Sequence, residues 1–218
     1  MTIKLNAQSG GSVALDAPTQ TTGSADITLK LPVADGSAGQ ALKTDGSGNL
    51  SFGSAGLSYG VTDIDAWAIS SAYTASSNSN IMDTNWYRFA TASGTHFPQL
   101  GGAMTQSSGI FTFPSTGFWV MEFTLGGYNI SDNSGTYFGG QIFFSNDSGS
   151  NYDRISTAYT NMMGSSDHGE VFMKSYVDVT DTSTCRVKFH TNLSASKTIF
   201  GDSDEMRSGV VFTRIGDT

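Results

Sequence analysis

The aromatic residues of this 218-residue chain are distributed very unevenly, and their distribution limits what each part can fold into. Of the 14 Phe, 3 Trp and 8 Tyr residues, only Phe52 precedes position 57. Bulky aromatic side chains supply much of the apolar surface that a domain buries when it folds. We therefore expect a hydrophobic core in the C-terminal three quarters, and we expect the first 56 residues to lack one.

Charge and hydropathy argue against several classes of partner and location for this chain. Charged residues make up 14% of the chain, against roughly 25% in typical soluble domains, and the formal net charge is −8. Lys and Arg occur singly, so we expect no nucleic-acid partner. No apolar stretch approaches the roughly 18 residues of a membrane span, and the first residues lack the apolar core of a secretion signal. We therefore expect neither membrane insertion nor classical secretion.

The first 56 residues show the pattern of short strands without a sheet of their own. Runs of period two occur at Ser12–Asp16 and Asp26–Leu31, separated by Gly, Pro, Thr and Ser, and Thr44–Asn49 is a turn sequence. One copy of the chain has too few apolar side chains here to cover these runs. We therefore expect them to pack against other copies of the same chain.

The sequence from Leu57 onward indicates an all-β domain. Gly53–Gly56 contains only small residues and is the expected linker, which divides the chain into a stalk segment, 1–56, and a head domain, 57–218. Seven short runs of alternating aromatic and branched residues predict a β-sandwich or jelly roll. Helical periodicity is scarce, and only Ser194–Ser203 could hold a turn of helix. The expected strands are Trp86–Ala90, Gly109–Phe113, Phe118–Leu125, Phe138–Phe144, Glu170–Val177, Cys185–Phe189 and Val210–Ile215.

A resemblance to a known superfamily lies in the segment GIFTFPSTGFWV at Gly109–Val120. It resembles the C1q-like branch of the C1q/TNF jelly-roll superfamily, in which a strand ending in Pro leads through a short Gly-containing turn into an aromatic core strand. Val177–Phe189 and Ser208–Ile215 are similar to later parts of the same fold, and Phe89-x7-Phe97 fits its upstream spacing. The resemblance covers about residues 60–217 and implies a homotrimer.

The alternation in Phe118–Leu125 supports the same arrangement from the residues themselves. Large apolar side chains occur on both faces of this expected strand, since Phe118 and Val120 alternate with Trp119 and Met121. We expect such a strand where one sheet face fills the sandwich and the other meets a neighbouring subunit. Glu122 departs from this pattern, on the same face as Phe118.

The N-terminal segment carries a second resemblance. GSVALDAP at Gly11–Pro18, ITLKLP at Ile27–Pro32 and GQALKTDGSGNLSF at Gly39–Phe52 look like segments of tail-fibre-type structural proteins of tailed phages. Such segments commonly precede a variable C-terminal domain. The resemblance implies that residues 1–56 attach to other virion structural proteins and that the chain is part of a virion, assembled in the host cytoplasm and released by lysis.

Residues capable of catalysis or metal binding are sparse. His96, His168 and His190 lack ligands at recognisable spacing, and no nucleophile elbow is present, so we expect no enzyme. Cys185, the only cysteine, is expected to be a buried structural thiol that forms no intrachain disulfide. Calcium is the one cofactor left open, because two acidic groups could supply oxygen ligands. They are Asp202, Asp204 and Glu205, and Asn146, Asp147, Asn151 and Asp153.

Tyrosines at the edges of three polar segments are the candidate contact residues. The segments Asn129–Thr136, Ser145–Asp153 and Thr160–His168 are rich in Asn, Ser, Asp and Tyr, and the tyrosines are Tyr128, Tyr137, Tyr152 and Tyr159. Amide groups and tyrosine rings suit contact with a host-surface glycan, although such residues also form ordinary turns in all-β proteins.

The sequence therefore predicts a structural protein of a phage virion that forms a trimeric fibre or appendage and displays a knob for attachment to the host surface. Two alternatives stay open. One is a capsid fibre or decoration protein on the head of the particle, and the other is a soluble C1q-like carbohydrate-binding module.

Overall fold

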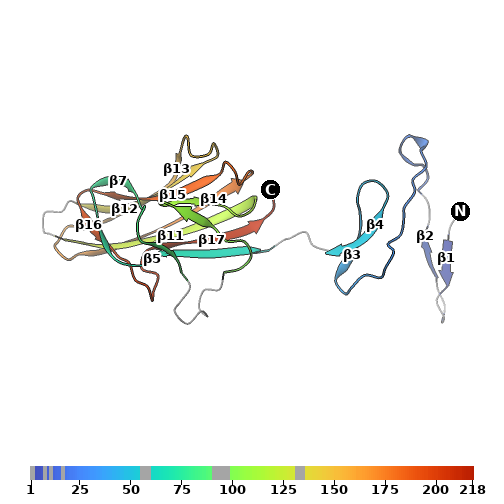
Figure 1. Cartoon of the computed structure of the whole chain (residues 1–218), viewed down its shortest axis with the longest axis horizontal. Coiled ribbons are helices and arrows are strands. Elements are labelled where there is room, and N and C mark those ends of the chain that lie inside the picture. The colour runs from blue at the N-terminus through green and yellow to red at the C-terminus, as the bar shows by residue number, and fades with distance from the viewer. Residues whose placement is uncertain are drawn as a thin grey trace. The chain divides into compact units, whose positions relative to one another are not determined.

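The computed structural model describes residues 3–6, 9, 12–15, 18–54, 60–89, 99–130 and 136–218 (Figure 1). The chain divides into two compact units, Met1–Leu57 and Ser58–Thr218. Apart from one 3₁₀ turn, η1 (Thr22–Ser24), the regular elements of the described residues are strands. None of the described helical residues forms a segment long and apolar enough to cross a membrane. Gly56 and the expected boundary beside it lie outside the described residues.

The N-terminal unit holds two small antiparallel hairpins. Strand β1 (Ile3–Asn6) pairs with β2 (Ser12–Leu15), and β3 (Gln40–Thr44) pairs with β4 (Leu50–Ser54). The second hairpin turns at Asp45, whose carboxylate accepts hydrogen bonds from the backbone N–H groups of Ser47 and Asn49 at 2.8 and 3.1 Å. Such a side-chain acceptor satisfies the amides of a tight turn and so fixes the register of the hairpin.

Two expectations for the N-terminal unit were wrong. The run Asp26–Leu31 forms no strand, because only Lys30 makes ladder hydrogen bonds, donating to the Gly48 carbonyl and accepting from the Leu50 N–H. Gly53 and Ser54, expected in the linker, continue β4 instead. Pairing with β3 satisfies backbone groups that a linker would leave to water.

None of residues 18–53 is buried in one copy of the chain. The apolar side chains of this unit instead remain exposed, and they are Ile27, Leu29, Leu31, Val33, Leu42 and Phe52. The absence of a core among these residues matches the shortage of aromatic side chains in the sequence.

The C-terminal unit, here called the head unit, contains two antiparallel sheets. The first sheet has the order β6-β16-β11-β17-β5-β8, with β14 on the other edge of β11, and the second has the order β13-β12-β15-β10-β9, with β7 beside β10 on β15. The first sheet consists of β5 (Asp63–Ile69), β6 (Tyr73–Ala75), β8 (Trp86–Arg88), β11 (Gly117–Asn129), β14 (His168–Val179), β16 (Lys197–Ile199) and β17 (Gly209–Gly216). The second consists of β7 (Asn78–Ile81), β9 (Thr105–Ser107), β10 (Ile110–Thr112), β12 (Tyr137–Ser145), β13 (Asp153–Asn161) and β15 (Arg186–Leu193).

All seven strands expected in this unit are present, with shifted ends, although Ala90 lies outside the described residues. Ser194–Ser203 holds the short strand β16 rather than a turn of helix, because its backbone pairs with both β11 and β6.

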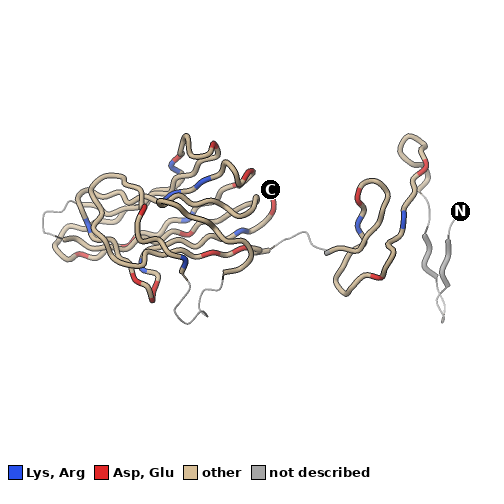
Figure 2. The backbone as a smooth tube through the Cα atoms, in the orientation of Figure 1, with Lys and Arg blue, Asp and Glu red and all other residues tan. Residues whose placement is uncertain are grey.

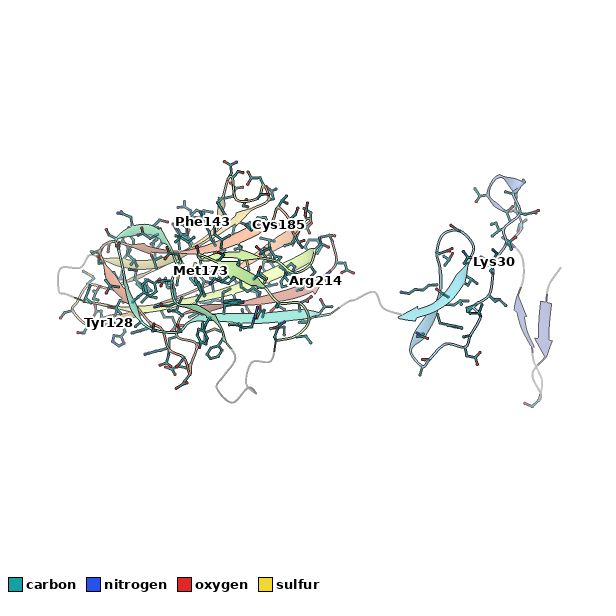
Figure 3. All side chains as sticks on the ribbon, viewed as in Figure 1. Lys30, Tyr128, Phe143, Met173, Cys185 and Arg214 are labelled. Atoms are coloured by element: carbon teal, nitrogen blue, oxygen red, sulfur yellow. The ribbon has the colours of Figure 1, made fainter. Side chains whose placement is uncertain are left out.

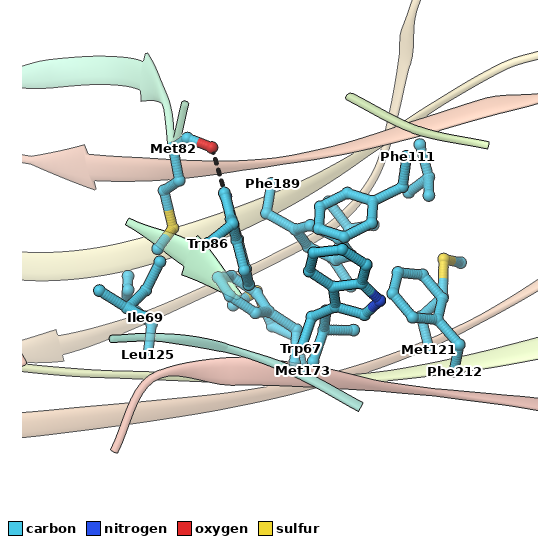
Figure 4. Close-up of a cluster of buried hydrophobic side chains, with 14 of the residues drawn as sticks. Trp67, Ile69, Met82, Trp86, Phe111, Met121, Leu125, Met173, Phe189 and Phe212 are labelled. Atoms are coloured by element: carbon cyan, nitrogen blue, oxygen red, sulfur yellow. Dashed lines mark hydrogen bonds between the residues drawn. The ribbon is translucent and has the colours of Figure 1, made fainter. Parts of the chain in front are cut away.

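Inward-facing side chains from both sheets form one hydrophobic core (Figure 4). Phe111 lies at its centre, with its ring edge-on to Trp67 at 5.4 Å and to Trp86 at 5.1 Å between ring centroids. The indole N–H of Trp86 donates to the Met82 carbonyl at 2.6 Å. Buried rings in edge-to-face contact stabilise a core beyond the area they bury, and so hold the two sheets in one arrangement. Cys185 is a free, buried thiol in the same core.

Asp65 is a buried carboxylate at the edge of this core, with 1% of its surface exposed. It accepts four hydrogen bonds, from Trp67 Nε1, from Nε and Nη2 of Arg88, and from the Met104 backbone N–H, at 2.8 to 3.2 Å. The Arg88 guanidinium also lies over the Trp67 ring at 4.8 Å. A buried charge is tolerated only when it is paired and hydrogen-bonded in this way.

Candidate binding face of the second sheet

The structure brings three of the four candidate tyrosines to one sheet and places the fourth on the other. Tyr137 lies in β12, Tyr159 in β13, and Tyr152 immediately before β13. Tyr128 lies in β11 of the first sheet (Figure 3). It stacks on Phe200 at 5.7 Å and lies 5.8 Å from the His168 ring.

The register of β12 with its two neighbours shows which side chains share the solvent side of the second sheet. Facing residues of an antiparallel pair point to the same side. Phe189, opposite Ile142, points into the core, so the residues alternating with them point outward. Three cross-strand rows result, which we call the outer face: Arg154, Phe143 and Lys188; Thr157, Gln141 and His190; and Tyr159, Gly139 and Asn192.

Lys188 and Phe143 form the cationic and aromatic end of the outer face. The Lys188 ammonium lies 3.8 Å from the centre of the Tyr152 ring and 5.6 Å from that of Phe143. Burial lowers the pKa of Lys188 from its ordinary value. Arg154, on the other side of Phe143, is exposed. The Lys188 ammonium therefore lies within cation–π distance of two aromatic rings, whose faces attract its positive charge.

Tyr159 forms the opposite end of the outer face, and Gly139 makes room for it. A Cβ atom on Gly139 would lie only 2.3 Å from Cδ1 of the Tyr159 ring, so the ring covers the glycine. The Asn192 amide donates to the Tyr159 hydroxyl at 2.7 Å, and the Tyr137 ring meets Tyr159 edge-on at 5.3 Å. These contacts fix a ring whose residue is still 53% exposed.

The middle row contains a chain of hydrogen bonds that begins at the exposed Ser79. The Ser79 hydroxyl donates to Gln141 Oε1 at 2.7 Å and lies 2.9 Å from His190 Nδ1. Because that hydroxyl proton is used on Gln141, the remaining lone pair of Ser79 accepts from Nδ1–H of a neutral His190. Burial, and then the nearby charge of Lys188, lower the pKa of His190 to about 4, so the ring is neutral at pH 7.

Three buried polar atoms on or beside the outer face lack a hydrogen-bond partner among the described residues. They are Gln141 Nε2, His190 Nε2 and the Tyr152 hydroxyl. Gln141 is 1% exposed. With Nδ1 protonated, His190 Nε2 is an acceptor, whereas Gln141 Nε2 is a donor. Buried polar groups without a hydrogen-bond partner are uncommon and lower the stability of a fold. A cluster of them therefore indicates a candidate functional site.

The acidic groups considered for calcium serve turns in this structure. Asp147 accepts from the backbone and side-chain N–H groups of Asn151 at 2.9 and 2.7 Å and from the Ser145 hydroxyl at 2.7 Å. These bonds lower its pKa to about 2. Asp202 accepts from the Asp204 N–H at 2.8 Å. Within the described ranges, no three His, Cys, Asp or Glu residues are placed to hold a metal ion.

The remaining histidines do not join the outer face. His96 lies outside the described residues. His168 packs edge-on against Phe200 at 5.3 Å, beside a hollow of about 390 Å³ that Glu170, Glu205 and Arg207 also line. The His168 ring therefore contacts aromatic side chains rather than a nucleophile.

A second surface with exposed aromatic side chains lies on the solvent side of β11 and β14 in the first sheet. Phe118 is 45% exposed in β11, and Phe172 and Tyr176 are 57% and 64% exposed in β14. The register places Phe172 opposite Thr124 and Tyr176 opposite Val120, so all three aromatic side chains share one side. Glu122 meets Lys174 across the strands at 3.1 Å. We call this surface the assembly face.

The sequence indicated the tyrosines but not their neighbours on the outer face. Phe143, Arg154, Lys188, Gln141 and His190 come from three strands, and only the register brings them together. The available signal was the alternation of Arg186, Lys188, His190 and Asn192 with apolar residues in one strand, which predicts a shared exposed side.

Comparison with known proteins supports the fold. No protein-family model matches the chain. No curated protein matches it in sequence. The chain is similar in structure to the Eiger TNF protein from S. frugiperda, with a TM-score of 0.55, 9% identity, and coverage of 73% of this chain and 95% of that one. It is also similar to murine APRIL at pH 5.0, with a TM-score of 0.51, 5% identity, and coverage of 70% and 98%. The expected all-β jelly roll of the C1q/TNF type is confirmed, and identities this low show the fold alone.

Proposed function

We propose that this chain is a non-enzymatic structural protein of a phage virion, in which the head unit forms a homotrimer and the first unit attaches it to other virion proteins. The trimer displays a knob that contacts the host surface through the outer face. The observation that carries the trimer is the assembly face, because large exposed aromatic side chains gathered on one side of a sheet are typical of a surface that another chain covers.

A second copy of the chain is the partner that fits the assembly face. Closed symmetric assembly of identical chains is the commonest way to cover such a surface, and the jelly-roll resemblance implies a trimer. The cross-strand pair of Glu122 and Lys174 suits this role, since it places two opposite charges beside the aromatic side chains without a net charge. Pairing within one copy lowers the cost of burying both groups on assembly.

The N-terminal unit supports the attachment role. In one copy, residues 18–53 bury none of their side chains, and Leu31, Val33 and Phe52 line a groove of about 660 Å³. The unit therefore depends on other chains for a core. The phage assignment itself rests on the resemblance of this segment to tail-fibre-type proteins, and the virion localisation follows from that assignment.

We propose no enzymatic activity, because the rings of His168 and His190 contact aromatic side chains and the Asp147 carboxylate accepts hydrogen bonds in a turn. Figure 2 shows Lys and Arg positions on both units together with Asp and Glu positions, and we propose no nucleic-acid partner for a chain with a net charge of −8.

The solution mass tests the trimer. We expect three times the chain mass of 23.0 kDa for the full chain by light scattering. Phe172→Glu places a charge on the assembly face and should release monomers. Tyr159→Glu makes the same kind of change on the outer face and should remain trimeric. A monomeric parent chain, or equal behaviour of the two variants, would contradict the proposed interface.

Labelling of purified virions tests the assignment to a particle. An antibody raised against residues 57–218 should decorate the virion in electron micrographs, and label on the tail would favour a fibre whereas label on the head would favour a capsid decoration protein. Absence of label from particles would refute the virion role. In that case the remaining candidate is a soluble carbohydrate-binding module, which the ring and amide pair of Tyr159 and Asn192 favours.

A further inference from the structure

We propose that the outer face binds an acidic saccharide, whose carboxylate group contacts Lys188 and Arg154 and whose sugar ring packs on Tyr159. This inference rests on the proposed attachment function and names the chemistry of the surface that the knob recognises. Its basis is the charge of the face, the placement of its aromatic rings, and the unpartnered polar atoms between them.

The charge of the outer face is opposite to that of the whole chain. The chain has 11 Lys and Arg against 19 Asp and Glu residues, yet Lys188 and Arg154 lie in one cross-strand row with only Phe143 between them. Neither cation forms a salt bridge within the described residues. Cationic side chains without an acidic partner are complementary to a ligand carboxylate, with which they form charge-assisted hydrogen bonds.

The neighbouring charged side chains leave these two cations available. Arg186, in the adjacent row, donates from Nη1 to the carbonyls of Thr182 and Cys185 and from Nη2 to that of Ser183, so it adds positive charge while its donors serve a turn. Asp147 is held by Ser145 and Asn151 as described above. Asp181 likewise accepts from the Ser183 N–H and hydroxyl, both at 2.7 Å.

The aromatic end supplies contacts for a sugar ring. A pyranose has an apolar C–H face that packs on an aromatic ring, and hydroxyl groups at its rim that bond to amides. Tyr159 offers an exposed ring held by Tyr137, and Asn192 offers the amide beside it. Rigid aromatic side chains of this kind bind at a low cost in conformational entropy.

The distance between the two ends indicates the size of the ligand. Phe143 and Gly139 are four residues apart on β12, which corresponds to about 13 Å along a strand. The distance between the carboxylate contact and the ring contact is therefore greater than the length of one sugar ring. The unpartnered donor of Gln141 and acceptor of His190 lie buried in the row between them, so a ligand hydroxyl contacts them only when the side chains over them shift. The ligand is therefore a short oligosaccharide rather than a single sugar.

Calorimetric titration of the full chain tests the proposal. The probes are oligogalacturonate and sialyllactose, each compared with its methyl ester, which keeps the sugar and removes the negative charge. We expect at least one acid form to bind, at least tenfold more tightly than its ester. Lys188→Gln and Arg154→Gln should each weaken binding about tenfold, the effect of losing one charge-assisted hydrogen bond. Binding of neither acid, or equal binding of acid and ester, overturns the proposal.

A matched control locates the site. Arg207→Gln removes one exposed Arg that lies beside the hollow of the first sheet, and it should leave binding unchanged. Loss of binding in this variant, with no loss in Lys188→Gln, overturns the location. Light scattering of the same samples separates the two proposals. If the chain is a trimer and binds no acidic saccharide, the saccharide site is refuted and the trimer is not. If the chain is a monomer and binds one, the trimeric knob is refuted and the saccharide site is not.

Discussion

The stability of the head unit should fall as the pH drops from about 6.5 to about 4, because His190 is neutral in the fold. Its pKa is lowered to about 4 from an ordinary value of 6.5 by burial and by the charge of Lys188. In that range the unfolded chain binds a proton that the folded chain does not, so the free energy of unfolding rises with pH. Above 6.5 and below 4 both states have the same charge on this residue, and its contribution is constant.

The size of the effect follows from the two pKa values. A difference of 2.5 pH units between 6.5 and about 4 corresponds to about 3.4 kcal/mol as an upper limit. The imidazole is only partly buried, so solvent screens its interactions and reduces this figure. We expect about 1 to 2 kcal/mol to be lost on acidification.

Urea unfolding followed by tryptophan fluorescence measures this loss, since the three tryptophans, Trp67, Trp86 and Trp119, all belong to the head unit. Protein concentration is held fixed, because an assembly couples to stability by mass action. The matched variant is His190→Gln, which keeps an amide beside Ser79 and removes the titrating group. Asp147, whose pKa is lowered to about 2, loses its stabilising effect only below about pH 4 and outside this range. Equal pH dependence in the parent chain and His190→Gln would refute the reasoning.

Three further predictions concern the fold and the electrostatics of the outer face. Asp65→Ala removes the acceptor of four buried hydrogen bonds and should cost about 3 to 5 kcal/mol in urea unfolding, whereas Glu205→Gln, in an exposed ion pair, should cost less than about 1. Gly109→Ala should lower the melting temperature, with a cost of about 1 to 3 kcal/mol, because φ is +76° and the new Cβ would lie 2.2 Å from a backbone carbonyl oxygen. Lys188→Gln should raise the pKa of His190 towards its ordinary value, measured from its imidazole resonances by NMR, and an unchanged pKa would contradict the contribution of Lys188.

The strands that could be predicted from the sequence are those in which aromatic and branched residues alternate. β11 and β14 have strong alternation, and β14 has every second residue buried, from Val171 to Val179. β13 was missed because it is an edge strand with few apolar residues, of which Ile155 and Ala158 are only partly buried. Its position depends on pairing with β12, and that pairing carries no local sequence signal.

The candidate site was only partly predictable for a related reason. Tyr137 begins β12, at the edge of its polar segment as the sequence indicates, whereas Tyr159 lies within the paired strand β13. A sequence pattern relates residues that are close along the chain. Lys188 and Arg154 are far apart along the chain, and they lie close only because both pair with Phe143. Cross-strand pairs of this kind depend on the register of the strands. A shift of one residue would turn these side chains to the other face of the sheet.

The two exposed faces of the head unit differ in how firmly their side chains are held, and this difference suits one to the proposed trimer contact and the other to the proposed ligand contact. On the assembly face Glu122 pairs with Lys174, whose ammonium also lies 5.8 Å from the centre of the Tyr176 ring, and the exposed rings of Phe172 and Tyr176 can pack against another chain. On the outer face, Tyr159 is held by Tyr137 and Asn192. A face that is fixed before binding pays less entropy when a small ligand arrives, whereas an apolar face gains most from burial by a large partner. Substitutions on one face should therefore leave the function of the other intact, because the core between the sheets holds both.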